Sequence, residues 1–180
     1  MKAVSGDTSD ESTAVLGWSR TKVRLPADAL VLDVGCGAWP NAAATFACDR
    51  SLDDDEHRTG LATTVDRPFV MCDAGNLPFR DGAVDFLIAS HIAEHVDDPE
   101  RFCRELARVA RSGYIETPSP LADYALDEEY HKWRVGGGGS HVHFGAKPPK
   151  SRVMEALTTR FYRLFYAGRE LGAPTYRLPG

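Results

Sequence analysis

The sequence predicts an α/β fold with a mostly parallel sheet. Short apolar segments follow one another along the first two thirds of the chain, separated by helical or loop segments. The first segment ends at a glycine turn, and the others end at a polar residue or a proline. Short, wholly apolar strands are typical of a parallel sheet that is covered on both faces. The predicted strands are residues 29–34, 44–48, 68–72, 84–89 and 113–117.

The composition indicates one folded domain. Of the 180 residues, 43% are apolar and 26% are charged, which is ordinary for a globular chain. The 26 acidic and 21 basic residues give a formal net charge of -5, so the chain lacks the positive charge of a general nucleic-acid binder. No apolar run approaches the roughly 18 residues of a membrane-spanning helix. We therefore expect neither nucleic acid nor a membrane as a partner.

The N-terminus and the cysteines bear on location. Residues 1–12 are polar and acidic and lack the basic and apolar stretches of a secretory signal peptide, so we expect a flexible tail there. Residues 13–180 are then expected to form the single domain. The four cysteines are scattered and include no C-x-x-C pair, which favours free thiols in a reducing cytoplasm. They are Cys36, Cys48, Cys72 and Cys103.

Two helices are predicted before residue 120. A short one over residues 13–25 is expected to pack Val15, Leu16 and Trp18 onto the domain. The other follows the fourth strand, with Asp97 or Asp98 as its cap and Pro99 in its first turn. The expected apolar stripe of this helix is Phe102, Leu106 and Val109. On its exposed face, the pairs Glu100/Arg104 and Arg101/Glu105 lie four residues apart. Gly113 is expected to end the helix.

The last third of the chain contains a substrate-side insertion or hairpin over residues 121–150. Residues 133–135 and 141–144 are its predicted strands. The Gly-Gly-Gly-Gly-Ser run at 136–140 matches a common laboratory linker, which suggests an engineered replacement of a natural loop; a natural glycine loop is the alternative. Residues 151–167 have the pattern of an amphipathic helix.

Polar residues at the ends of the predicted strands carry the main functional indication. The Asp33-x-Gly35-x-Gly37 turn follows the first strand, where glycines permit a sharp turn and close approach to a ligand. The ends of the next three strands carry Asp49, Asp73 and the pair Ser90 and His91. Ligands of open parallel sheets bind outside the carboxyl ends of the strands, so these side chains are candidate binding residues.

Three stretches give the chain a family resemblance. Residues 31–37, 72–79 and 86–99, which include the glycine turn and the Ser90-His91 pair, resemble the motifs of a class I S-adenosylmethionine-dependent methyltransferase. The resemblance covers residues 28–120 and fits a small, single-domain, type 11-like member. It implies a Rossmann-like, mostly parallel sheet of about seven strands with flanking helices.

The resemblance also implies a binding site for S-adenosylmethionine, with S-adenosylhomocysteine as product. The turn residues Asp33, Gly35, Cys36 and Gly37 would lie against the methionine part. Asp49 would hold the ribose, with Arg50 beside it, and Asp73 and Ala74 would meet the adenine. Ser90 and His91 would line the methyl-transfer site.

The sequence departs from the broad family pattern at the first crossover. The third glycine of the usual turn is absent, and only seven residues separate Gly37 from Thr45. This is shorter than a normal βαβ crossover, so we expect one helical turn or a loop. The chain resembles a subgroup with a short proline-containing segment here and a later His-x-Trp, which is His131-Lys132-Trp133 in this sequence.

The implied reaction is O- or N-methylation of a small molecule, an in-line displacement in which positioning supplies much of the rate. A hydroxyl acceptor needs a base, and histidine suits that work near neutral pH. His91 is the first candidate, followed by His131 and Glu116. The atom methylated, the acceptor and the oligomeric state stay open.

Several alternatives remain at this stage. The chain could bind the donor without catalysing transfer. A nicotinamide dehydrogenase is disfavoured because the third glycine and the long helix are missing. His91-x-x-Glu94-His95 matches the inverted zincin motif of a zinc hydrolase. The alternative interpretation is that His95 packs against or caps a helix without binding metal. His131, His141 and His143 are either a metal cluster or solvent-exposed or substrate-pocket histidines.

Overall fold

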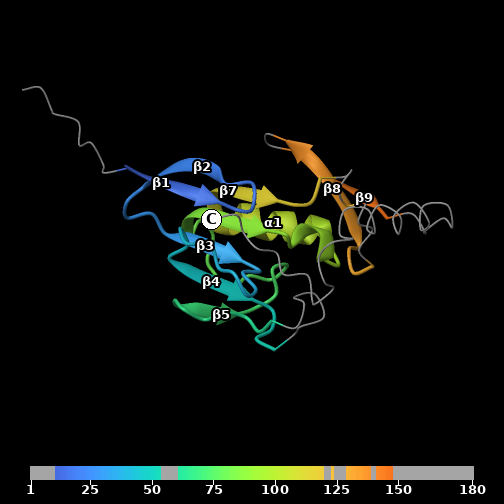
Figure 1. The fold of residues 1–180 in the computed structure, drawn as a ribbon, viewed down its shortest axis with the longest axis horizontal. Helices are drawn as coiled ribbons and strands as arrows, with labels where there is room; N and C mark the ends of the chain where they lie inside the picture. The colour runs from blue at the N-terminus through green and yellow to red at the C-terminus, as the bar shows by residue number, and fades with distance from the viewer. Residues whose placement is uncertain (1–10, 54–60, 120–122, 124–128, 139–140, 148–180) are drawn as a thin grey trace, which may run out of the picture.

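The computed structural model describes residues 11–53, 61–119, 123, 129–138 and 141–147. Its central sheet has five parallel strands in the order β5-β4-β3-β6-β7 (Figure 1). The predicted parallel α/β architecture is confirmed, whereas the expected count of about seven strands is not, since the described residues place five in this sheet. The strands are β3 (Val31–Val34), β4 (Phe46–Asp49), β5 (Phe69–Met71), β6 (Val84–Ser90) and β7 (Ala110–Glu116).

Helix α1 (Pro99–Val109) covers one face of this sheet. Asp98 is its cap and accepts a hydrogen bond from the Arg101 N–H at 3.0 Å, which decides between the two predicted caps. The predicted stripe is buried and packs against apolar side chains of β3 and β6. The exposed Glu100–Arg104 pair is present at 3.1 Å.

Two details of the α1 prediction are corrected. Gly113 does not end the helix, because α1 stops at Val109 and Gly113 lies within β7. A Cβ there would stand 3.0 Å from the Leu87 carbonyl oxygen, so close strand packing explains the glycine. Glu105 pairs with Arg108 at 2.7 Å, and no ion pair with the predicted partner Arg101 is found among the described residues.

The prediction of a helix over residues 13–25 is wrong. This segment forms an antiparallel hairpin of β1 (Glu11–Leu16) and β2 (Thr21–Pro26), so the expected tail also ends earlier than residue 12. Ala14 and Leu16 are buried while the intervening Val15 is exposed, which is the period of a strand. The hairpin packs against the sheet face opposite α1, in a cluster that includes Val31, Phe86 and Ile88.

The second predicted hairpin is confirmed. It consists of β8 (Trp133–Gly138) and β9 (His141–Ala146), which lie to the right in Figure 1. Val135 is buried in the main core, with Trp133 and Phe144 packed against it. The first three glycines of the run, residues 136–138, belong to β8. That the run replaces a natural loop stays a prediction. The predicted helix over residues 151–167 lies outside the described residues.

Two expectations about the chain's chemistry can be compared with the structure. All four cysteines are free thiols, as predicted. In the part of the chain that the structure describes, no helix is both long enough and apolar enough to cross a membrane.

Candidate functional site

The candidate site lies at the carboxyl ends of the two central strands. From β3 the chain proceeds through β4 to β5 on one side, then crosses to β6 and β7 on the other. This reversal between adjacent parallel strands creates a crevice at their carboxyl ends, the usual ligand position in open α/β sheets. Asp33 lies on β3 and Ser90 ends β6, so the topology brings two of the predicted positions to this reversal.

The glycine turn after β3 is attached to the end of β4. Gly35 has a φ of +69°, and its N–H donates to the Cys48 carbonyl at 2.8 Å, as does that of Cys36 at 3.2 Å. A Cβ at Gly35 would lie 2.4 Å from the Ile92 side chain, so only glycine fits here. The Gly37 N–H donates to the Asp49 carboxylate at 2.9 Å. The turn and the acid predicted to hold a ribose are therefore adjacent.

Asp33 is buried beneath the first crossover. Its carboxylate accepts a hydrogen bond from the Asn41 N–H at 2.6 Å. Burial raises the pKa of Asp33 to about 6, although the Asn41 hydrogen bond and the charge of Arg67 oppose the rise and Asp49 adds to it. Asp33 thus fixes the crossover loop and titrates close to neutral pH.

The crossover contains turns and no helix in residues 38–44, as its length predicts. Arg67 holds it by donating to the carbonyl oxygens of Asn41 at 2.6 Å and Ala44 at 2.8 Å. Arg67 also pairs with Asp66 at 2.7 Å. Nothing in the linear pattern points to the role of Arg67 in the crossover, because the two carbonyl groups that it holds lie more than twenty residues earlier.

The structure places the remaining predicted donor-site residues at neighbouring strand ends. Asp73 follows β5 and accepts the Gly75 N–H at 2.6 Å, which fixes the turn there. Ala74 packs partly buried against the main core. Arg50 is exposed directly after β4. The pKa of Asp97 is lowered chiefly by its hydrogen bond from Lys132, and the positive charge of Arg50 adds to this effect. These contacts fit a donor site without testing the predicted contacts to adenine and ribose.

Glu116 ends β7 and joins the N-terminal hairpin to the sheet. Its carboxylate accepts hydrogen bonds from the N–H groups of Trp18 and Ser19, both at 2.7 Å, and from the Ser90 hydroxyl at 2.8 Å. Burial acts to raise the pKa of Glu116, but the hydrogen bonds from Ser90, Ser19 and Trp18 outweigh it and hold the pKa below its usual range. Glu116 is therefore an ionised, well-satisfied acceptor.

His91 follows directly after β6 in an unusual backbone conformation. Its φ is +56°, a region that few non-glycine residues occupy, and its N–H donates to the Glu116 carbonyl at 2.8 Å. The imidazole lies against Trp18, with ring centroids 5.0 Å apart, and its Nδ1 is 3.4 Å from Glu94 Oε1. A strained residue held by two elements is typical of a functional site. The sequence does not predict this contact of Trp18, because the helix expected over residues 13–25 would not place its side chain over the end of β6.

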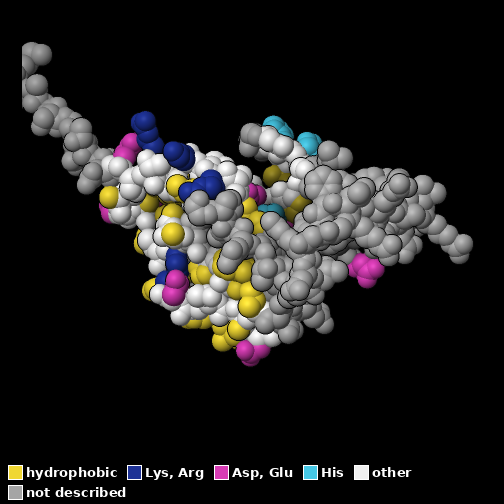
Figure 2. All heavy atoms as spheres, in the orientation of Figure 1, with side chains coloured by type: hydrophobic (Ala, Val, Ile, Leu, Met, Phe, Trp, Pro, Cys, Tyr) yellow, Lys and Arg dark blue, Asp and Glu magenta, His cyan; other side chains and the backbone are white. Residues whose placement is uncertain are grey.

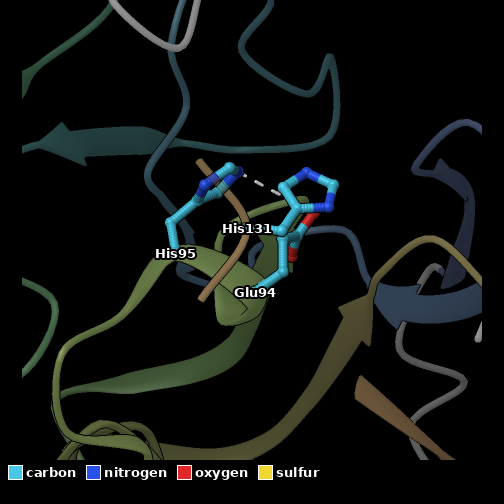
Figure 3. Close-up of side chains that lie close together, drawn as sticks. All are labelled: Glu94, His95 and His131. Carbon is cyan, nitrogen blue, oxygen red and sulfur yellow. Dashed lines mark ion pairs between the residues drawn. The ribbon is translucent and has the colours of Figure 1, made fainter. Parts of the chain in front are cut away.

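The third candidate base, His131, lies in a cluster with Glu94 and His95, which borders His91 through Glu94 (Figure 3). Glu94 and His95 belong to the short 3-10 helix η1 (Ala93–His95), and His131 precedes β8. Of the proposed metal sets, the structure gathers neither the inverted zincin pair His91 and His95 nor His131 with the histidines of β9. Figure 2 shows exposed histidine side chains at the β8–β9 hairpin.

Comparison with known proteins gives the same family as the motifs. Residues 32–115 match the family model described as a methyltransferase domain. An uncharacterized methyltransferase of Mycobacterium tuberculosis (strain H37Ra) is 36% identical over 163 residues, covering 82% of this chain and 64% of the relative. One from Mycobacterium sp. (strain KMS) is 35% identical over 115 residues, covering 60% and 46%.

Among solved structures, the YcgJ protein from Bacillus subtilis has 24% identity and a TM-score of 0.45, covering 58% of this chain and 55% of that one. The chain spans about half to two thirds of the length of the curated relatives. Residues 32–115 therefore resemble a methyltransferase domain, and the curated relatives that share this similarity are methyltransferases.

Proposed function

We propose that this protein transfers the methyl group of S-adenosylmethionine to an oxygen or nitrogen of a small molecule. The observation that carries the proposal is the meeting of the glycine turn, Asp49 and the Ser90-His91 pair at the reversal of the sheet. A ligand in the crevice at this reversal lies outside the carboxyl ends of both central strands.

The contacts suggest a division of roles at the donor side. The turn bearing Gly35 can bring backbone close to the ligand, since its φ of +69° suits glycine and leaves no side chain there. Asp49 is buried beside the turn, where one carboxylate oxygen engages the Gly37 N–H. A carboxylate so placed suits the ribose hydroxyls of the donor. Asp73 and Ala74 follow the neighbouring strand and would flank the adenine.

His91 is the best placed of the three candidate bases. It follows β6 directly, is half-buried beside Trp18, and carries an imidazole, the side chain that most often serves as a general base. Glu116 is held ionised by three donors, so it suits positioning of Ser90 and the hairpin turn better than proton transfer. His131 belongs to the cluster of Glu94 and His95 and hydrogen-bonds to Asp123, so a different role for it is argued below.

Thermal unfolding with S-adenosylmethionine, S-adenosylhomocysteine and NAD tests the donor site. A ligand at 100 times its dissociation constant stabilises a fold by about 2.7 kcal/mol, which raises the Tm by several degrees. We expect shifts with both sulfur nucleosides and none with NAD. Asp49→Ala should abolish the shifts, whereas the exposed control Asp28→Ala should retain them. Folded protein that responds to neither nucleoside contradicts the proposal.

The competing hypothesis is a domain that binds the donor without transferring its methyl group. Formation of S-adenosylhomocysteine in the presence of hydroxylated and amine metabolites separates the two. Acceptor-dependent product formation supports the enzyme, and donor binding without product across the panel supports the binding module.

A further inference from the structure

We propose that Glu94, His95 and His131 form a binding site for a divalent transition-metal ion, with zinc as the preferred ion. Each residue presents one ligand atom, and the three atoms lie within 4.8 Å of one another (Figure 3). Two imidazoles and one carboxylate are a donor set that suits zinc and related first-row ions. The set differs from the inverted zincin pattern, because the second histidine comes from a segment 36 residues further along the chain.

The buried state of Glu94 is the first argument for a cation. Its side chain is 2% exposed, and neither carboxylate oxygen receives a hydrogen bond from the described residues. Within the described part of the chain, the basic atoms that reach Glu94 are His91 Nδ1 at 3.4 Å and His95 Nε2 at 3.9 Å, both from Oε1. A buried carboxylate without hydrogen bonds is costly, and a bound cation would offset that cost directly.

The outer contacts of both histidines are the second, independent argument. His95 Nδ1 lies 3.3 Å from the Tyr130 carbonyl oxygen, which leaves Nε2 directed at Glu94. His131 Nδ1 is hydrogen-bonded to the buried carboxylate of Asp123. Metal-binding histidines almost always donate their second ring N–H to a carboxylate or a backbone carbonyl, which fixes the ring and the ligating nitrogen. Both arrangements occur here in one cluster.

The backbone holds the cluster together before any ion binds. The Lys132 N–H donates to the Glu94 carbonyl at 2.8 Å, and the Trp133 indole N–H donates to the Val96 carbonyl at 2.8 Å. Lys132 Nζ also pairs with Asp97 at 2.5 Å. These contacts dock the His131-Lys132-Trp133 segment onto η1, so little reorganisation is needed to bring the three ligand atoms into the first coordination shell.

Three protein ligands leave at least one coordination position open, as in catalytic rather than structural zinc sites. The site borders His91, so an oxygen of the methyl acceptor is a suitable fourth ligand, alongside water. This last step rests on the proposed methyl transfer, whereas binding of the ion by the protein alone does not.

Metal binding by the full chain, stripped with a chelator and without any methyl donor, tests the site. We expect calorimetric titration with Zn²⁺ to show one saturable site, and Co²⁺ to give the visible absorption of nitrogen- and oxygen-ligated cobalt. Glu94→Gln and His131→Ala should abolish tight binding and these bands. Asp123→Asn should weaken binding by about 10- to 100-fold, the usual effect of losing an outer-shell partner. Mg²⁺ in place of Zn²⁺ should bind more weakly, since imidazole is a poor ligand for it.

The matched control is His143→Ala, which removes an exposed histidine of β9 and should leave binding unchanged. Each variant is first checked for native far-UV circular dichroism. Glu94→Gln keeps the shape of the side chain, so it still provides the test if His131→Ala does not fold. No saturable site in the folded protein, or equal losses in His143→Ala and Glu94→Gln, overturns the proposal. S-adenosylhomocysteine binding, measured separately, shows whether the donor site stands or fails independently of the metal.

Discussion

Glu116 and Trp18 lie 98 residues apart in the sequence, yet the Glu116 carboxylate accepts the Trp18 N–H at 2.7 Å. The same carboxylate accepts the Ser19 N–H and the Ser90 hydroxyl. One side chain thus connects the turn of the N-terminal hairpin to the ends of β6 and β7. Because Trp18 in turn covers His91, the hairpin supplies one wall of the candidate transfer site.

Replacing Glu116 with Gln should loosen this connection. The amide retains one acceptor oxygen and places an NH2 group against at least one of the backbone donors. Hydrogen bonds to charged groups contribute about 1.5–3 kcal/mol, so we expect a loss of that order in the free energy of unfolding. Urea denaturation measures it, with the exposed Glu100→Gln as a control that should change stability by less than about 0.5 kcal/mol. Similar stabilities for the two variants would contradict the role of Glu116.

The raised pKa of Asp33 predicts a pH-dependent stability. Its pKa is about 6 in the folded chain, against 3.8 as the ordinary value, so between these values the folded state binds more protons than the unfolded state. The free energy of unfolding should therefore fall as the pH rises through this window, by about 3 kcal/mol in total. Roughly half of this decrease should occur above pH 5. Asp33→Asn removes the titration and keeps an acceptor for the Asn41 N–H.

The measurement is urea denaturation of both proteins from pH 5 to pH 8. We expect the difference in unfolding free energy, wild type minus Asp33→Asn, to become more negative as the pH rises. A constant difference would mean that Asp33 ionises in the folded chain as it does when unfolded.

His91 allows its chemical and backbone roles to be separated. Its φ of +56° is accessible to Asn and Gly, so His91→Asn and His91→Gly remove the imidazole without adding backbone strain. If His91 is the base, both variants should form S-adenosylhomocysteine about 10²- to 10⁴-fold more slowly with a hydroxyl acceptor found in the metabolite screen. Donor affinity should stay within a few-fold of wild type. Undiminished turnover in His91→Asn would remove His91 from the mechanism.

Local patterns in the sequence were sufficient for the sheet and α1. The five parallel strands and the Asp98-capped helix each depend on contiguous residues, whose apolar pattern and capping chemistry are visible in the chain itself. The helix predicted over residues 13–25 is wrong because the spacing of Val15, Leu16 and Trp18 also fits one helical face. Its true period of two is clear only from burial against the sheet, and Gly17 supplies the tight turn with a φ of +60°.

In the candidate site, too, the sequence predicts local features but not the contacts between distant segments. Residues at strand ends were predictable, because parallel strands bring consecutive carboxyl ends to one edge. The contacts that hold them were not, since Arg67 reaches residues 41 and 44 and Asp123 reaches His131 only in the folded chain. The sequence predicts His131 as a candidate base, or as a metal ligand with the histidines of β9. Spacing along the chain does not reveal the docking of Lys132 onto η1, which brings His131 to Glu94 and His95.

Arg67 offers a test of how a crossover without a helix keeps the donor site in order. Its guanidinium donates to two carbonyl groups of the loop that also supplies the Asn41 N–H to Asp33. Arg67→Ala removes the guanidinium donor from both carbonyls, of which that of Asn41 keeps the Ala44 N–H at 3.0 Å. We therefore expect a loss of about 1–3 kcal/mol in unfolding free energy and weaker binding of S-adenosylhomocysteine. Urea denaturation and calorimetry measure the two effects.

The control Arg104→Ala removes only an exposed pair with Glu100 and should cost less than about 0.5 kcal/mol, with donor binding unchanged. If Arg67→Ala binds the nucleoside as tightly as Arg104→Ala does, the crossover keeps its shape without this arginine.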